Sequence, residues 1–371
     1  MLMFKRKQPS VTFEMDGPRK GNWFKQHKKL TIILAIVAVL LIGGGVTAFF
    51  LVNQKPAEHA KVASTSKKKA EPEPVHYYSL LTGNEVESRE ATTQPVTAIM
   101  IENSPDARPQ SGLKESGVVF EAIAEGGITR FLVLYQEQKP QLVGPVRSVR
   151  MYYVDWLAAF NASVAHVGGS AAALAEVRNG NYRDIDQFFN AGTYWRATDR
   201  YAPHNVYTSF KNIDALNEAK GYTSSEFTGF ARKDSTASKT PNATTIDVTI
   251  SSALYNSHYA YNAETNTYDR SQGGAAHTDR EAGQISPRVV IVMKVDETTV
   301  MEDGWRQNIQ AIGSGTAYIF QDGTAQEVTW TKKGRADQIV FTDSEGKSVP
   351  LARGQTWLTA VPNGTGGVSW Q

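Results

Sequence analysis

An uninterrupted apolar run, Leu30–Val52, lies near the start of the chain and holds no charged residue over its 23 positions. At about 1.5 Å per residue, such a run crosses a bilayer core of about 30 Å as one helix. It is apolar on every face, and Gly43–Gly45 would weaken a helix in a soluble core. The pattern therefore predicts a transmembrane helix that separates a head, residues 1–29, from a larger C-terminal part.

The charges beside this run predict its orientation. The head contains eight Lys or Arg and two acidic residues, whereas only Lys55 and Lys61 follow closely behind the run. Positively charged flanks stay in the cytoplasm, so we expect a single-pass protein of the cell membrane with its bulk outside. A cleaved signal peptide is the rival interpretation, but its apolar region is usually about 7–15 residues, and no small-x-small cleavage site follows Val52. We favour an uncleaved anchor.

Beyond the run, a polar tract precedes a segment with mixed periodicity. Residues 53–76 are rich in Lys, Glu, Pro and Ser and predict a disordered linker. Residues 77–222 alternate between strand and helix patterns, which predicts an α/β (or α+β) layered domain. The turn Glu125-Gly126-Gly127 is typical of a hairpin, and Ser209 of a helix N-cap. The expected strands are 95–102, 118–124, 128–136, 141–146 and 162–167, and the expected helices are 148–160, 171–178 and 210–220.

Helical periodicity is absent from the last third of the chain. Residues 223–245 predict an interdomain link, residues 246–362 a small mainly-β domain with a barrel or sandwich architecture, and residues 363–371 a flexible tail. The expected strands are 246–250, 255–261, 288–295, 317–321, 327–331, 338–342 and 356–361.

Composition narrows the possible functions. The chain has no cysteine, which excludes a disulfide framework, a thiol nucleophile, a Cys-ligated zinc and a lipidated cysteine. The charge of +2 is concentrated in the head, so the folded part is mildly acidic. A mildly acidic surface argues against nucleic acid as a general partner.

The first candidate site piece is the loop that follows the first strand. It contains Glu102, Asn103 and Arg108, and Pro105 and Pro109 restrict its backbone. A rigid turn capped by its own polar side chains and a loop that presents Glu102 and Arg108 to a ligand explain this pattern about equally well.

A second piece, Gly144–Arg150, ends a strand and starts a helix. Ser148 is the expected cap, and Arg147 and Arg150 lie where the helix dipole is already positive. Two cations at such a position indicate a compensating anion, and Arg130 could join them. The acidic residues that could instead pair with these arginines internally are Glu102, Glu121 and Glu125.

The third piece, His166–Ser170, is again a strand followed by glycines and a helix start. Gly168, Gly169 and Ser170 offer backbone N–H groups that suit a phosphate or carboxylate. If the strands before the two helices are parallel neighbours, both helix starts open on one sheet edge, where ligands bind in open α/β sheets. His166 and Glu125 are then the candidate acid or base groups.

A fourth polar segment, Arg196–Tyr207, completes the candidate set with Arg200, His204 and Asn205 as well as Arg196 itself. His277 and Asp279 could supply two metal ligands, which are too few for a site, so we expect a loop-capping pair and no metal. The chain contains no Gly-x-Ser-x-Gly, P-loop or His-Glu-x-x-His motif, and nothing in it indicates a cofactor.

These segments, together with several in the C-terminal half, resemble the YerB-type family of bacterial cell-envelope lipoproteins. The resemblance covers residues 80–362 and implies two domains, a surface location in Gram-positive bacteria and no characterised activity. This chain lacks the lipid-bearing Cys, so Leu30–Val52 would replace the lipid as anchor. The segments that carry the resemblance are IENSPDARPQSGL (101–113), EGGITRF (125–131), GPVRSVR (144–150), HVGGS (166–170), PHNVYTS (203–209), YDRSQGGAAHTD (268–279), GSGTAYIF (313–320) and GQTWLTAVP (354–362).

Three functional hypotheses remain. The preferred one is a non-enzymatic, membrane-anchored envelope protein that binds an anionic envelope ligand or a cell-wall enzyme through the Arg/Gly-rich loops. The second is an extracytoplasmic enzyme acting on phosphorylated glycan or polyprenyl-phosphate-linked wall precursors, by analogy with LytR–CpsA–Psr enzymes at the level of fold alone. In the third, a protein–protein scaffold, the arginines are paired internally.

Overall fold

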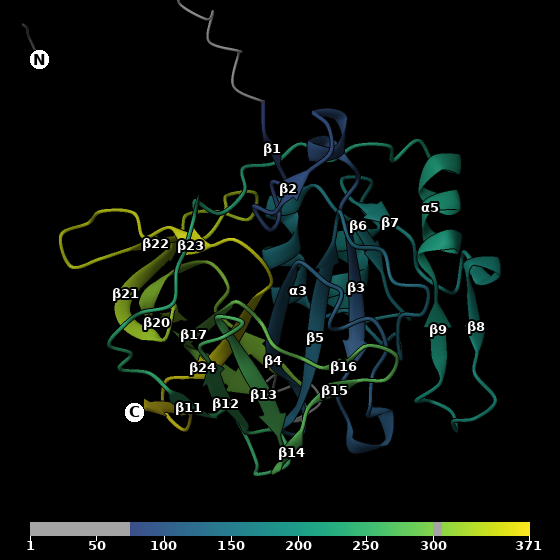
Figure 1. The fold of residues 1–371 in the computed structure, drawn as a ribbon. Helices are drawn as coiled ribbons and strands as arrows, with labels where there is room; N and C mark the ends of the chain where they lie inside the picture. The colour runs from purple at the N-terminus through teal and green to yellow at the C-terminus, as the bar shows by residue number, and fades with distance from the viewer. Residues whose placement is uncertain (1–74, 300–305) are drawn as a thin grey trace, which may run out of the picture. The chain divides into compact units, whose positions relative to one another are not determined.

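A ten-stranded mixed sheet runs through the described part of the chain, residues 75–299 and 306–371 of the computed structural model (Figure 1). Its order is β22-β21-β20-β17-β24-β4-β5-β3-β6-β7. The strands are, in that order, Val340–Thr342, Thr324–Lys332, Gly313–Gln321, Val289–Val295, Thr356–Pro362, Val118–Glu125, Ile128–Tyr135, Thr97–Glu102, Ser163–Ala165 and Arg183–Asp184.

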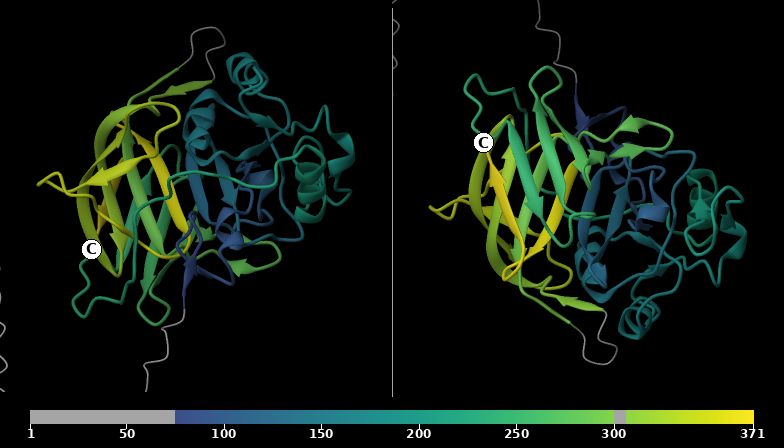
Figure 2. Two further views of the ribbon diagram at one scale, coloured as in Figure 1. Left: turned by 90° about the horizontal axis from the view of Figure 1, so that it is seen from above. Right: turned by 90° about the horizontal axis from the view of Figure 1, so that it is seen from below.

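The two halves of the chain meet within this sheet. β24 pairs with β4 in parallel, with Thr356 opposite Val118, so the last long strand of the chain lies beside an early one. Figure 2 shows the same arrangement from above and below, with the yellow and green strands of the C-terminal half continuing into the blue strands of the N-terminal half. The described chain is therefore mostly β with few helices, and its sheet is shared between the two halves.

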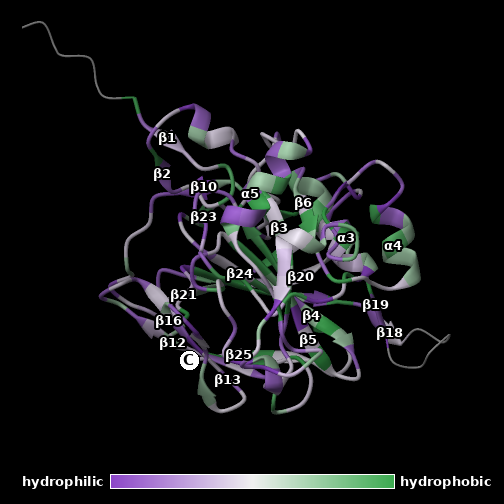
Figure 3. Ribbon diagram, turned by 90° about the vertical axis from the view of Figure 1, so that its right-hand side faces the viewer, coloured by the Kyte–Doolittle hydropathy of each residue, from purple (hydrophilic) through white to green (hydrophobic). Residues whose placement is uncertain are grey.

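Both faces of the central strands are covered, which explains their nearly continuous apolar sequence. On one face, Phe120 stacks on Trp156 of helix α3 with ring centroids 5.3 Å apart. On the other face, helix α5 covers β3 and β5, and a second, five-stranded sheet covers the C-terminal half. Figure 3 shows hydrophobic residues along the central strands between these layers. The helices α3, α4 and α5 are Met151–Leu157, Ala171–Val177 and Phe210–Ala219.

The five-stranded sheet has the order β14-β13-β12-β11-β25. Its strands are Ala275–Ala276, Thr267–Gln272, Ser257–Asn262, Thr245–Thr249 and Gly367–Trp370. The small two-stranded sheets are β1 (Tyr77–Tyr78) with β2 (Glu85–Val86), β8 (Tyr194–Arg196) with β9 (Val206–Thr208), β10 (Arg232–Lys233) with β23 (Leu351–Ala352), β15 (Thr278–Asp279) with β16 (Gly283–Gln284), and β18 (Glu297–Thr299) with β19 (Gln307–Ile309). The 3-10 helices η1 to η4 are Glu90–Thr93, Pro105–Ala107, Ala158–Phe160 and Ala191–Thr193.

The start of helix α3 differs from the sequence-based expectation. The helix begins at Met151, and Arg150 rather than Ser148 is its N-cap residue. Val149 N donates to Gly168 O at 3.0 Å, which holds the preceding residues in an extended conformation. A hydrogen bond to a distant segment thus takes the place of the first helical turn that the local pattern predicts.

Other expected elements are close to the observed ones. Ser209 caps α5, because its Oγ accepts a hydrogen bond from Asn212 N at 3.2 Å. Residues 141–146 form only isolated bridges to neighbouring segments and no regular strand. Within the expected flexible tail, β25 pairs with β11, and Trp370 lies opposite Ile246.

The predicted membrane helix, Leu30–Val52, and the basic head lie outside the described residues, as does the linker before residue 75. Between residue 75 and the C-terminus, leaving aside 300–305, no helix is both long and apolar enough to span a bilayer.

Candidate functional site

Three parallel strands, β3, β6 and β7, end at one edge of the large sheet, which we call the carboxyl edge. Residues 102–110 follow β3, residues 166–170 follow β6, and residues 185–190 follow β7. The first and third pieces of the candidate set therefore meet at the edge where open α/β sheets bind ligands.

Four residues at this edge, Glu102, Ser104, Arg147 and His204, form what we call the edge cluster. Glu102 Oε1 accepts a hydrogen bond from Ser104 Oγ at 2.9 Å and lies 2.9 Å from His204 Nδ1. Arg147 Nε is 3.3 Å from the same oxygen. Glu102 is buried, and its Oε2 has no hydrogen-bond partner within 75–299 and 306–371. The cluster thus brings together residues from three of the four predicted pieces.

The guanidinium group of Arg147 is only partly used. Its side chain is 26% exposed. In the described part of the chain, the one polar contact of the guanidinium group is the pairing of Nε with Glu102. Its terminal nitrogens therefore remain available as donors to a ligand. Glu102 would keep His204 as a partner if Arg147 turned away from it.

Arg108 and Arg200 hold the loop after β3 in place. Arg200 donates to the carbonyl oxygens of Asp106 at 3.1 Å and Pro109 at 2.5 Å. Arg108 donates to Asn103, through Nε to Oδ1 at 3.1 Å and through Nη2 to the carbonyl oxygen at 3.0 Å. Both arginines shape the loop, and their role as ligand contacts stays a prediction.

Arg196 and Asn205 lie on the β8–β9 hairpin and contact each other rather than the edge cluster. Arg196 Nη1 donates to Asn205 Oδ1 at 2.8 Å. Arg196 also lines a pocket of about 410 Å³, to which Trp195 and Arg280 contribute.

Glu125 is held between two arginines. Its Oε1 accepts a hydrogen bond from Arg130 Nη2, and its Oε2 accepts one from Arg150 Nη2, both at 2.7 Å. Arg130 also donates to the carbonyl oxygen of Ser148 at 2.9 Å. Burial favours a higher pKa for Glu125, but the two guanidinium groups outweigh it and lower the pKa. A carboxylate in this state remains ionised at neutral pH. Glu125 therefore pairs with Arg150, one of the two cations expected to require an external anion, and with Arg130, and the three groups keep one net positive charge.

His166 is fully buried within its own small network. Its Nδ1 lies 2.8 Å from Gly168 O, and its Nε2 lies 2.9 Å from Asp184 Oδ1. Both ring nitrogens thus lie within hydrogen-bond distance of an oxygen atom of the chain. The ring therefore supports the loop after β6, and no ring nitrogen is left to face a substrate.

Two backbone donors of the glycine loop are also occupied. Gly168 N donates to Asp186 Oδ1 at 3.2 Å, and Ser170 N donates to Val149 O at 3.2 Å. A Cβ at Gly169 would lie 2.9 Å from Val149 O, so the glycine allows two backbone segments to approach closely. We conclude that this loop packs against the segment before α3 through the groups expected to bind a ligand.

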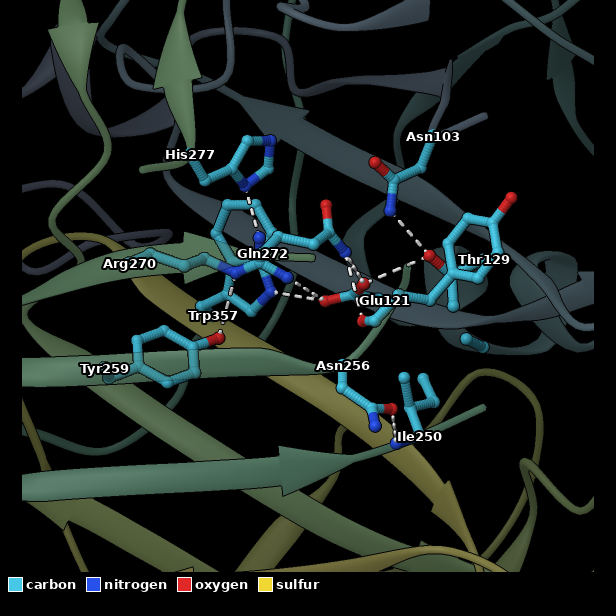
Figure 4. Close-up of polar contacts among 12 residues, drawn as sticks. Asn103, Glu121, Thr129, Ile250, Asn256, Tyr259, Arg270, Gln272, His277 and Trp357 are labelled. Atoms are coloured by element: carbon cyan, nitrogen blue, oxygen red, sulfur yellow. Dashed lines mark hydrogen bonds and ion pairs between the residues drawn. The ribbon is translucent and has the colours of Figure 1, made fainter. Parts of the chain in front are cut away.

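A closed ring of buried hydrogen bonds lies on the face of β4 and β5 that packs against the five-stranded sheet, and Figure 4 shows the part of it from Asn103 through Glu121 to His277. Arg270 Nη2 donates to Glu121 Oε2 at 2.8 Å, and Arg270 Nη1 contacts His277 Nδ1. On the other side of Glu121, Thr129 Oγ1 donates to Oε1 at 3.1 Å. The ring is completed by His277 Nε2 to Gln110 Oε1 at 3.1 Å, Gln110 Nε2 to Asn103 Oδ1 at 3.0 Å and Asn103 Nδ2 to Thr129 Oγ1 at 2.6 Å.

We call these six residues the buried ring. Glu121 and Arg270 have no exposed surface, and Glu121 also accepts hydrogen bonds from Trp357 Nε1 at 3.0 Å and Gln272 Nε2 at 3.2 Å. A buried ion pair is favourable when such additional bonds satisfy it. The ring therefore joins the loop after β3 to the five-stranded sheet. Sequence reasoning assigned no role to Arg270, although one charged residue within the apolar strand at Glu121 predicts a buried partner.

His277 has a defined protonation state in this ring. Its Nδ1 accepts from the guanidinium group of Arg270, so the proton is on Nε2, which donates to Gln110. Burial, together with the charges of Arg270 and Arg108, lowers the pKa of His277 well below its usual value. The imidazole of His277 is therefore neutral at neutral pH.

The lowered pKa of His277 predicts a pH-dependent stability. The unfolded chain takes up this proton below about pH 6.5, whereas the folded chain does not, so stability is complete above that pH and is lost as pH falls. In urea unfolding, the free energy should fall by up to about 1.4 kcal/mol per pH unit from this group. The His277→Gln variant should be less stable at neutral pH but should lack this component. A constant difference between the two proteins from about pH 7.5 to about pH 5.5 would contradict the assignment.

The described residues contain no group of three or more His, Asp or Glu side chains placed to hold a metal ion. His277 belongs to the buried ring, whereas Asp279 lies outside it. Asp279 Oδ1 accepts hydrogen bonds from the backbone N of Glu281 at 3.1 Å and of Ala282 at 3.0 Å. Asp279 thus stabilises its own loop.

Comparison with known families identifies the class of protein. Residues 81–223 match the N-terminal domain, and residues 246–358 the C-terminal domain, of a family described as "Protein of unknown function (DUF3048)". The chain belongs to this two-domain family, and both domains contribute strands to the large sheet.

A relative supports the same assignment. The chain is 33% identical over 289 residues to the Bacillus subtilis (strain 168) protein named "Putative lipoprotein YerB", covering 76% of this chain and 86% of that protein. It also resembles the crystal structure of YerB from Bacillus subtilis, with a TM-score of 0.71 and 31% identity over 79% of this chain and 99% of that one. The resemblance to the YerB-type family is confirmed.

Proposed function

We propose that this protein is an extracytoplasmic, membrane-anchored envelope protein that binds an anionic envelope ligand at the carboxyl edge. The lipoprotein name of its relative supports an envelope location. The predicted anchor, residues 30–52, would supply the attachment that a lipid supplies in a lipoprotein. No observation favours a cell-wall enzyme as the ligand, so that partner stays a second prediction.

The observation that carries the proposal is the state of Arg147. Within the candidate set, Arg130 and Arg150 both pair with Glu125, and Arg108 and Arg200 bind loop carbonyls or amides. Arg147 is partly exposed and keeps unused donors beside His204, which can retain Glu102. A guanidinium group with free terminal nitrogens suits a phosphate or carboxylate.

The edge cluster is also well separated from the point where the described chain begins. The described chain begins beside the end of β5, where Ser79 Oγ donates to Gln136 Oε1 at 3.1 Å. The end of β5 pairs with the start of β3, so residue 75 enters near the edge opposite the edge cluster. Figure 1 shows β1 and β2 at the upper end of β3. Within the described residues, the chain therefore begins at the end of β3 opposite to the edge cluster.

The enzyme alternative has less support from the geometry. Glu125 is an ionised partner of two arginines with a lowered pKa, which makes it a poor general acid. His166 has both ring nitrogens engaged and no exposed surface. Action on phosphorylated glycan or polyprenyl-phosphate-linked precursors would therefore need other residues.

Ligand binding by an Arg147→Ala variant tests the proposal. The full-length protein in detergent micelles would be titrated with poly(glycerol phosphate) in a calorimeter. Charged hydrogen bonds contribute about 1.5–3 kcal/mol, so the variant should bind about tenfold more weakly or worse. Arg89→Ala removes an exposed arginine before β3 and should leave the affinity unchanged. Equal affinities of the two variants, or no binding by the natural chain, would contradict the proposal.

A further inference from the structure

The pocket beside the β8–β9 hairpin has the features of a second binding site. It has a volume of about 410 Å³ and is lined from both family domains, by Trp195, Arg196, Asp199 and Tyr207 on one side and Arg280 and Glu281 on the other. We infer that this pocket binds a neutral sugar unit of a glycan chain. The inference is independent of the anionic ligand proposed for the edge cluster, because Arg147 does not line the pocket.

The aromatic wall of the pocket is formed by cross-strand neighbours. Trp195 on β8 lies directly opposite Tyr207 on β9, so both side chains are on the same face of the hairpin. Tyr207 is buried, whereas Trp195 remains 40% exposed. An indole in this state offers a flat apolar surface, and the C–H face of a pyranose ring is the complementary surface of a sugar.

The polar wall is balanced in charge. Arg280 Nη2 lies 2.6 Å from Asp199 Oδ2 and Arg280 Nε lies 3.7 Å from Glu281 Oε1, so Arg280 pairs with both carboxylates, and Arg196 lines the same pocket. The hydrogen bond to Arg280 lowers the pKa of Asp199, which keeps the pair ionised at neutral pH. Two cations and two anions give no net attraction for an anionic ligand. Paired guanidinium and carboxylate groups can instead donate to and accept from neighbouring hydroxyls.

The pocket is also held in shape without a ligand. Arg200 fixes the loop between β8 and β9 to the carbonyls of Asp106 and Pro109, and Arg280 N donates to Gln110 O at 2.8 Å. Asn205 Nδ2 closes the base of the same loop by donating to Ala197 O at 3.0 Å. A wall that is already ordered loses little conformational freedom on binding.

Titration of the full-length protein with neutral tetrasaccharides tests this inference. The probes are linear tetramers of N-acetylglucosamine, glucose and mannose, and calorimetry gives the affinity. We expect at least one tetramer to bind, with an affinity that high salt leaves within about twofold, because no charge is neutralised. Trp195→Ala should weaken binding about tenfold or more, whereas Trp195→Phe should stay within about threefold of the natural chain.

Trp370→Ala is the matched control, since Trp370 is also 40% exposed but lies on β25. Its affinity should equal that of the natural chain, and circular dichroism would establish that every variant is folded. Failure of all three tetramers to bind would overturn the inference, as would an unchanged affinity in Trp195→Ala. An affinity that falls steeply with salt would also overturn it, because it would identify an ionic ligand. None of these outcomes depends on the result with poly(glycerol phosphate).

Discussion

Replacing Arg270 by methionine should lower the free energy of unfolding by about 3–5 kcal/mol, the usual cost of removing one partner from a buried ion pair. Both Arg270 and Glu121 have no exposed surface, and their contact is 2.8 Å. The variant leaves the carboxylate of Glu121 buried with only neutral donors. Because single domains are stable by about 5–15 kcal/mol in total, this change should shift the urea midpoint strongly.

The effect should extend beyond the ion pair, because Arg270 belongs to the buried ring. His277 Nδ1 loses its donor in the variant, and the order of donors and acceptors around the ring is interrupted. A double variant, Arg270→Met with Glu121→Leu, removes both charges and should recover part of the loss. It should not recover all of it, because Thr129, Gln272 and Trp357 then lack their acceptor.

Arg280→Met is the matched control for this experiment. Arg280 also pairs with a carboxylate, that of Asp199 at 2.6 Å, but the two side chains are 37% and 51% exposed. Exposed pairs contribute about 0–1 kcal/mol, so this variant should be nearly as stable as the natural chain. Similar losses in Arg270→Met and Arg280→Met, measured by tryptophan fluorescence in urea, would show that the buried ring does not carry the expected energy.

Neither half of the chain should fold when it is produced alone. Residues 73–371 form one compact unit, and β24 from the C-terminal domain lies between β17 and β4. A fragment that ends at residue 240 would expose the edge of β4 and leave Glu121 without Arg270. A fragment that starts at residue 241 would leave β24 unpaired on one side and Arg270 without its carboxylate.

Circular dichroism and thermal unfolding test this expectation. The full chain should unfold in one cooperative transition, and each fragment should show none. Co-expression of the two fragments is the control, because it supplies both sides of the sheet and should restore the transition. A cooperative transition in either fragment alone would establish that the family domains are independent folding units.

Several elements could be predicted because neighbouring residues determine them. The β4–β5 hairpin follows from two apolar runs around Gly126 and Gly127, whose φ angles of 56° and 77° favour glycine. Ser209 caps α5 through a bond to a residue three positions later. The start of α3 could not be predicted, because Val149 is held by Gly168, a residue of the loop after β6.

The pairings of the candidate residues were less predictable than the strands and turns that carry them. The loops 144–150 and 166–170 were expected at one edge if the strands before them were parallel neighbours, but residues 141–146 form only isolated bridges, and β6 pairs in parallel with β3 and β7. No pattern among neighbouring residues shows which carboxylate pairs with which basic side chain. Glu102 pairs with His204, which is 102 positions away, and Glu121 pairs with Arg270, which is 149 positions away. Of the two partners expected for Arg150, an external anion and an internal carboxylate, the structure shows the internal one, Glu125.

Strand positions, the hairpin turn and the cap at Ser209 were already set by the order of residues, since each depends on contacts within a few positions. The union of both domains in one sheet, the buried ring and the pairing of Arg147 through Nε arose only when distant segments packed together. Burial makes an unpaired charge costly, so the folded chain selects partners by proximity in space. In the described residues, that selection leaves Arg147 partly exposed at the carboxyl edge and Trp195 partly exposed in its pocket, the two places where we propose ligands.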